Sequence, residues 1–93
     1  MAAKLTFRAH ALRRMFERQI SVDDIIAVID GGQTIENYQE DKPYPSRLVL
    51  GWRGVRPVHV VVARNLSENE LIVITVYEPD PKLWQDDFRR RKI

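Results

Sequence analysis

The amino-acid sequence predicts an α+β fold with two N-terminal helices, a four-stranded antiparallel meander sheet and a short C-terminal helix. Residues 7–29 repeat apolar side chains at helical spacing, whereas residues 33–77 hold four alternating or continuously apolar segments separated by turn residues. The most apolar segment, residues 71–77, is rich in β-branched side chains and is followed by Pro79 and Pro81, which cannot extend a strand. This segment is therefore predicted to be a central strand of the sheet.

The two expected helices carry recognisable start and stop signals. Thr6 is a suitable N-cap for a helix over residues 7–19. Residues 21–24, Ser-Val-Asp-Asp, resemble a capping box with Asp in place of the usual Glu, and Gly31 with Gly32 ends the second helix. Each helix has an apolar stripe, formed in the first by Ala11, Leu12, Met15 and Phe16, and in the second by Val22, Ile25, Ile26 and Ile29.

Four strands are expected at residues 33–39, 47–53, 58–63 and 71–77, with a proline-rich loop at 40–46. Alternation in the third segment places His59 on one face with Val61 and Ala63. Beyond the prolines, Asp80 is a suitable N-cap for the short C-terminal helix. In the second segment, alternation puts Leu48, Leu50 and Trp52 on one face and Arg47, Val49 and Arg53 on the other.

Length and composition suit one domain, expected to span residues 1–93. The absence of cysteine excludes disulfides and thiolate metal sites, and two histidines without a tight carboxylate motif predict no metal. No glycine-rich phosphate loop, nucleophile elbow or dinucleotide fingerprint occurs, so we expect no cofactor. The first residues lack the apolar core of a signal peptide and no apolar run reaches a membrane span, which predicts a cytoplasmic protein without membrane contact.

The net charge of +2 conceals alternating blocks of charge. Residues 1–18 carry five basic and one acidic side chain, and residues 19–46 carry one basic and six acidic ones. Residues 47–64 carry four Arg and no acid, and the chain ends in Arg89-Arg90-Arg91-Lys92. Basic blocks that meet in the fold would suit a phosphate backbone or an acidic protein, and the alternative is an ordinary mixture of solvated charges.

Candidate catalytic residues are His10, Arg14 and Arg18, which recur every four residues along one edge of the first helix. An imidazole can transfer a proton and neighbouring guanidinium groups can hold a phosphate, which is the combination that RNA cleavage needs. The alternative is a surface helix whose arginines pair with Glu17 and other acids.

His59 and Tyr77 are further candidates. His59 is a polar residue inside an apolar strand, so its ring must find a partner or face a cleft, and a satisfied sheet histidine is the alternative. Tyr77 at a strand end offers a ring for base stacking and a hydroxyl that needs a partner. Three arginines on or beside the strands could bind a nucleic-acid backbone: Arg47, Arg53 and Arg64.

Four stretches resemble a widespread family of small bacterial and archaeal domains of unknown function: residues 10–21, Tyr44-Pro45-Ser46, residues 56–61 and residues 74–84. That family is similar to the RelE, ParE and MqsR toxin group, whose barnase-like fold packs helices on a small antiparallel sheet. The resemblance implies a RelE/MqsR-toxin-like domain, a metal-independent ribonuclease often paired with an antitoxin. It implies His10 or His59 for proton transfer, Arg14 and Arg18 as phosphate clamps, and Tyr77 for hydrogen bonding or stacking.

Three hypotheses follow. The first is a metal-independent endoribonuclease toxin that acts on RNA and is held by an antitoxin protein. The second is a non-catalytic module that binds nucleic acid or an acidic protein, for which salt-sensitive binding without turnover is expected. The third is a self-associating domain, in which an edge strand or an apolar sheet face pairs two copies as a homodimer.

Overall fold

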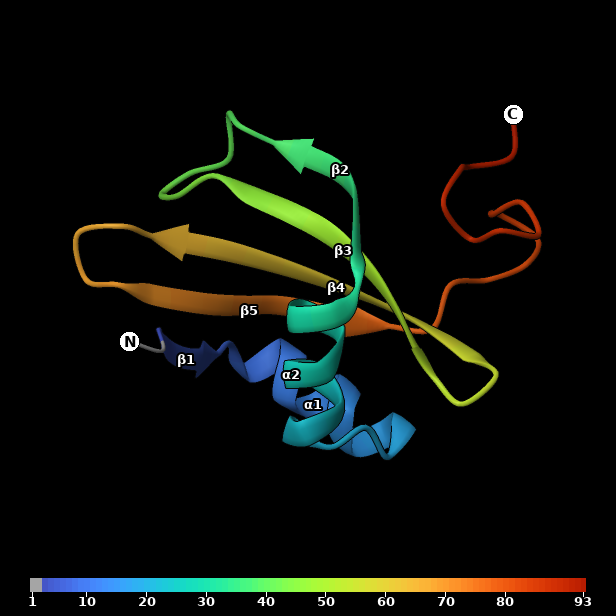
Figure 1. Ribbon diagram of the computed structural model, residues 1–93, viewed down its shortest axis with the longest axis horizontal. Coiled ribbons are helices and arrows are strands. Elements are labelled where there is room, and N and C mark those ends of the chain that lie inside the picture. Colours follow the sequence, from blue (N-terminus) through green and yellow to red (C-terminus); the bar gives the residue numbers. More distant parts are fainter. Residues whose placement is uncertain (1–2) are drawn as a thin grey trace.

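The computed structural model describes residues 3–93, which form a five-stranded sheet with two helices against one face (Figure 1). The strand order is β1-β5-β4-β3-β2. Helix α1 packs against β5, and α2 packs against β3 and β4. In chain order the elements are β1 (Lys4–Phe7), α1 (Ala9–Arg18), α2 (Val22–Gly31), β2 (Gln33–Tyr38), β3 (Ser46–Arg53), β4 (Arg56–Asn65) and β5 (Glu70–Tyr77).

The predicted four-stranded antiparallel meander is wrong, because the sheet has a fifth strand and is mixed. Strand β1 pairs with β5 in parallel, with Lys4 opposite Glu70 and Phe7 opposite Val73. Thr6, expected as a helix cap, lies within β1 and donates its hydroxyl to the Glu70 carboxylate at 2.6 Å. Without β1, the edge of β5 would carry unpaired backbone groups, and four residues are too few to show a strand period in the sequence.

The predicted C-terminal helix is also wrong. After β5, the N–H groups of Leu83 and Trp84 both donate to the Asp80 carbonyl, which makes a single turn. The chain then folds back, so that the Gln85 N–H donates to the Arg90 carbonyl at 2.8 Å. A helix of this length is marginal by itself, so the side-chain contacts of this stretch decide its path. We call residues 79–93 the C-terminal segment; it curls beside one end of the sheet (Figure 1).

Helix α2 begins and ends where the sequence indicates. Ser21 accepts from the Asp24 N–H at 3.0 Å and the Asp24 carboxylate accepts from the Ser21 N–H at 2.9 Å, which completes the capping box. The helix ends at Gly31 and packs closely on β3. A Cβ atom at Gly51 of β3 would lie 2.6 Å from a methyl group of Val28, so only glycine permits this approach.

Strand alternation divides the sheet residues between two faces. The face against the helices holds the main core, which includes Ala11, Met15, Ile25, Val28, Val49, Val58, Val60, Val62, Val73 and Val76. We call the opposite side the second face. A transverse row on it joins Leu50, His59 and Tyr77, which are paired across β3, β4 and β5. No helix in the described residues is both long and apolar enough to cross a membrane.

Candidate functional site

A groove of about 380 Å³ lies on the second face at the end of the sheet away from the C-terminal segment. Its floor comes from β4 and β5, one wall from the start of α1, and the other from the loop between β2 and β3. Strand β1 stops at Phe7, and the chain turns into α1 beside the middle of β5. The groove is lined by Arg8, His10, Lys42, Pro43, Tyr44, Ala63, Ile74 and Thr75.

The groove gathers groups that suit an anionic ligand. Arg8, His10 and Lys42 are all exposed to solvent at its rim. Helix α1 has no side-chain cap and no acidic residue in its first turn, so the positive end of its backbone dipole is not neutralised. A hollow of the same volume beside α2, about 380 Å³, is lined by no ionisable side chain. The groove is therefore the better candidate for chemistry.

Tyr44 is held in place at the groove by a neighbour from β4. Its hydroxyl accepts a hydrogen bond from Asn65 Nδ2 at 3.0 Å, and Asn65 is itself buried. A buried amide with a fixed partner restricts the ring to one orientation. The phenol thus presents a fixed aromatic surface beside the exposed cations.

His59 lies on the same face but is closed off from solvent. Its side chain is 0% exposed, and its Nε2 is 2.8 Å from the carbonyl oxygen of Phe88 in the C-terminal segment. Because a carbonyl only accepts, Nε2 carries the hydrogen and Nδ1 accepts from the Tyr77 hydroxyl at 3.1 Å. Burial lowers the pKa of His59 below its ordinary value and raises the pKa of Tyr77. His59 is therefore neutral, and both of its ring nitrogens form hydrogen bonds.

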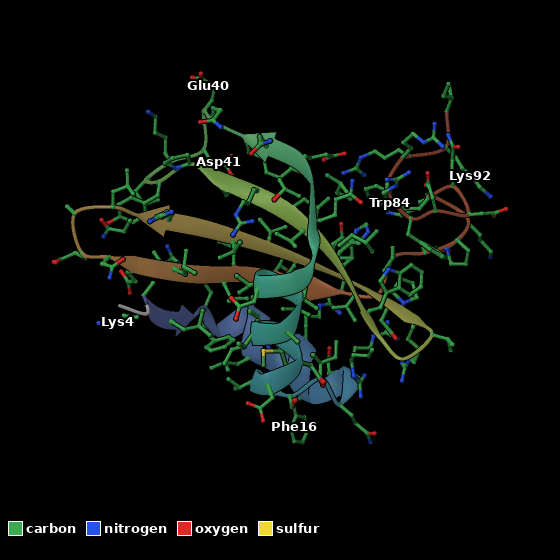
Figure 2. All side chains as sticks on the ribbon, viewed as in Figure 1. Lys4, Phe16, Glu40, Asp41, Trp84 and Lys92 are labelled. Carbon is green, nitrogen blue, oxygen red and sulfur yellow. The ribbon has the colours of Figure 1, made fainter. Side chains whose placement is uncertain are left out.

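The C-terminal segment covers His59 with the indole ring of Trp84. Trp84, which is 3% exposed, packs edge-on to the imidazole with 4.5 Å between ring centres. The Arg91 guanidinium lies 4.5 Å from the centre of the Trp84 ring and pairs with the Glu36 carboxylate of β2 at 3.4 Å. Figure 2 shows Trp84 at one end of the sheet, and Asp41, in the loop that forms one wall of the groove, at the other.

Arg14 and Arg18 follow His10 along α1 but do not line the groove. Arg14 is 3.5 Å from the Glu17 carboxylate, and Arg18 is 3.7 Å from that of Glu78 just after β5. Arg18 lies eight positions after His10 in the helix, which is about 12 Å along the axis. The row of three residues therefore extends from the groove along the edge of the sheet.

The predicted substrate-binding arginines lie on the face covered by the helices. Arg53 binds Asp24 of α2 at 3.0 Å, and Arg47 donates to the Thr34 hydroxyl at 2.9 Å. Arg47 and Arg64 line a separate hollow of about 240 Å³. The sheet therefore lies between these three arginines and the groove, and they do not meet His59 or Tyr77.

A sequence model of the family described as Domain of unknown function (DUF4258) matches residues 7–78. The chain belongs to this family. The search of curated proteins and the search of solved structures found no match. The matched residues include every part of the groove, together with His59 and Tyr77, and end directly before the C-terminal segment.

Sequence reasoning did not select three groove residues of the DUF4258 domain as site residues: Arg8, Lys42 and Tyr44. The sequence held a partial signal for this loop, because Lys42 and Tyr44 alternate with two prolines. Their approach to His10 depends on the path of the loop across the sheet, which local patterns do not report. Within residues 3–93, no three His, Asp or Glu side chains gather as a metal-binding cluster.

Proposed function

We propose that this DUF4258 domain is a metal-independent endoribonuclease of the toxin type, and that it cleaves RNA in the groove on the second face. One observation carries the proposal: the groove combines an exposed histidine, His10, with Arg8, Lys42 and the uncapped start of α1. These groups match a phosphodiester, because cations and helix N-termini bind phosphate and histidine transfers protons near neutral pH. The resemblance to the RelE, ParE and MqsR toxins supports the same reaction class.

The proposed reaction is a transfer within the RNA chain. His10 takes the proton of a ribose 2′-hydroxyl, whose oxygen then bonds to the adjacent phosphorus. The bond from phosphorus to the 5′ oxygen breaks, and that oxygen takes a proton from water. Arg8 and Lys42 stabilise the charge that develops on the phosphoryl oxygens, and the Tyr44 ring stacks on a base. The products are a 2′,3′-cyclic phosphate and a 5′-hydroxyl end.

His10 is favoured over His59 as the proton-transfer group because of exposure. Both nitrogens of His59 already have partners, and its ring has no path to a substrate while the C-terminal segment is in place. In the proposal Tyr77 holds His59 and does not touch RNA. Arg14 and Arg18, which follow His10 along α1, bind the RNA backbone outside the groove.

The test is cleavage of a structured RNA in the presence of EDTA. His10→Gln should lower the rate by about 100-fold or more, the usual contribution of a general base. Lys42→Ala should weaken cleavage, whereas Lys4→Ala, which removes the same charge from outside the groove, should not. End analysis should find the cyclic phosphate. Equal rates for the wild type and His10→Gln would refute the assignment.

The non-catalytic alternative rests on three arginines at the start of α1 and along it: Arg8, Arg14 and Arg18. It predicts RNA binding that weakens as salt rises, with no change in the RNA. Expression in a bacterial host separates the two functions. A toxin should arrest growth, His10→Gln should relieve the arrest, and a cognate antitoxin protein should do the same.

A further inference from the structure

The outer surface of the two helices carries an apolar patch with no partner among the described residues. Phe16 and Leu12 of α1 are 86% and 49% exposed, and Val22 and Ile26 of α2 are 45% and 40% exposed. Each pair is spaced four residues apart, so each forms one stripe on its helix. Figure 2 shows Phe16 projecting from the helices away from the sheet. Single exposed apolar residues are common, but two apolar stripes on consecutive helices make a candidate contact surface.

An apolar hollow lies next to this patch. It has a volume of about 240 Å³, and it lies where α2 meets β1 and β5. Ile26 belongs both to the hollow and to the apolar stripe on α2, so the hollow adjoins that stripe. The remaining lining residues are Ala3, Leu5, Ile29, Asp30 and Leu71. A helix surface that carries both a projecting ring and a hollow can match its own copy through a two-fold rotation.

The charges beside the patch are also self-complementary. Helix α1 has three arginines and one acidic residue, whereas α2 has three acidic residues and no basic one; next to the apolar stripes lie Arg13 of α1 and Asp23 and Asp30 of α2. In the described chain, none of these three side chains forms an ion pair. If a two-fold rotation places α1 of each copy against α2 of the other, opposite charges meet at two symmetric places. If α2 instead packed against α2 of the second copy, acidic side chains would face each other and repel.

We propose that two copies of this chain associate through the helix surface, with Phe16 of each copy seated in the hollow of the other. The contact is isologous, and α1 of one copy lies against α2 of its partner. The helices cover the face opposite the groove, so both grooves point outward in the dimer. The proposal therefore stands apart from the proposed RNA cleavage.

The first test is sedimentation of the full chain from micromolar to near-millimolar concentration. The wild type should pass from monomer to dimer as concentration rises. Phe16→Ser should raise the dimer dissociation constant by about 30-fold or more, as expected for the loss of a central aromatic contact. Val55→Ser is the matched control, because Val55 is 91% exposed on the turn between β3 and β4 and should not affect the dimer.

The second test reverses charge. Arg13→Glu alone and Asp23→Arg alone should each weaken the dimer, and the double variant should restore it, because the pair then attracts with exchanged signs. A monomeric wild type at the highest concentration would overturn the proposal. So would a dimer that Phe16→Ser leaves unchanged, or a monomer that uses Phe16 to bind a different protein or a lipid vesicle. No RNA enters either test, so failure of the ribonuclease proposal would not affect the result.

Discussion

Mild acid should destabilise this protein through one buried side chain, His59. The imidazole is 0% exposed, and removal from water lowers its pKa below the ordinary value of 6.5. In the unfolded chain the same group regains the ordinary value. Below pH 6.5 His59 therefore binds a proton in the unfolded state but stays neutral in the folded state, so stability falls as the pH falls.

The size of the loss follows from proton linkage. Above pH 6.5 both states are neutral at His59 and the full stability is present. Between that pH and the lower pKa of the folded state, each unit of pH removes up to about 1.4 kcal/mol from the free energy of unfolding. That is a large part of the roughly 5–15 kcal/mol typical of a small domain. Carboxylates with lowered pKa values, such as Asp24 and Glu36, act in the same direction but at lower pH.

Urea unfolding at a series of pH values measures this loss, with tryptophan fluorescence as the signal because Trp84 contacts the His59 ring. His59→Gln keeps a donor for the Phe88 carbonyl and an acceptor for Tyr77 but does not titrate. Its stability should fall far less than that of the wild type as the pH drops below 6.5. A flat wild-type curve, or an equal slope in His59→Gln, would show that the burial argument is mistaken.

Three other predictions concern packing, capping and titration. Gly51→Ala should destabilise the fold by about 1–3 kcal/mol in urea unfolding because its Cβ would meet Val28, while Gly31→Ala, which meets nothing within 4 Å, should change stability far less. Ser21→Ala should lower the free energy of unfolding by about 1 kcal/mol through loss of the capping box, and an unchanged urea midpoint would contradict this. Burial and the Glu36 carboxylate raise the pKa of Tyr38 to about 12, so an absorbance titration of tyrosine should show a late alkaline step that Tyr38→Phe reduces, with Tyr77, whose pKa burial also raises, accounting for the remainder.

The candidate site was only partly predictable from the sequence. His10 and its basic neighbours were visible as a helical row, and the placement of His59 with Val61 and Ala63 followed from strand alternation. The sequence did not show which histidine is accessible to solvent. Accessibility depends on the C-terminal segment, whose Trp84 and Phe88 fold back over His59 from more than 20 residues away. The groove likewise depends on a loop that approaches α1 across the sheet.

Local sequence patterns predicted the structural features that depend only on residues close together in the chain. The capping box starts α2 and glycine ends it, and alternation sends Arg47 and Arg53 to the opposite face from Leu48 and Leu50. These features depend on neighbours within a few residues, so they appear in the sequence directly. The extra parallel strand, the irregular C-terminal segment and the groove were decided by tertiary structure alone. Their stability comes from pairing and burial against residues far away in the chain, such as Glu70 for Thr6 and His59 for Phe88, and local periodicity carries no record of those partners.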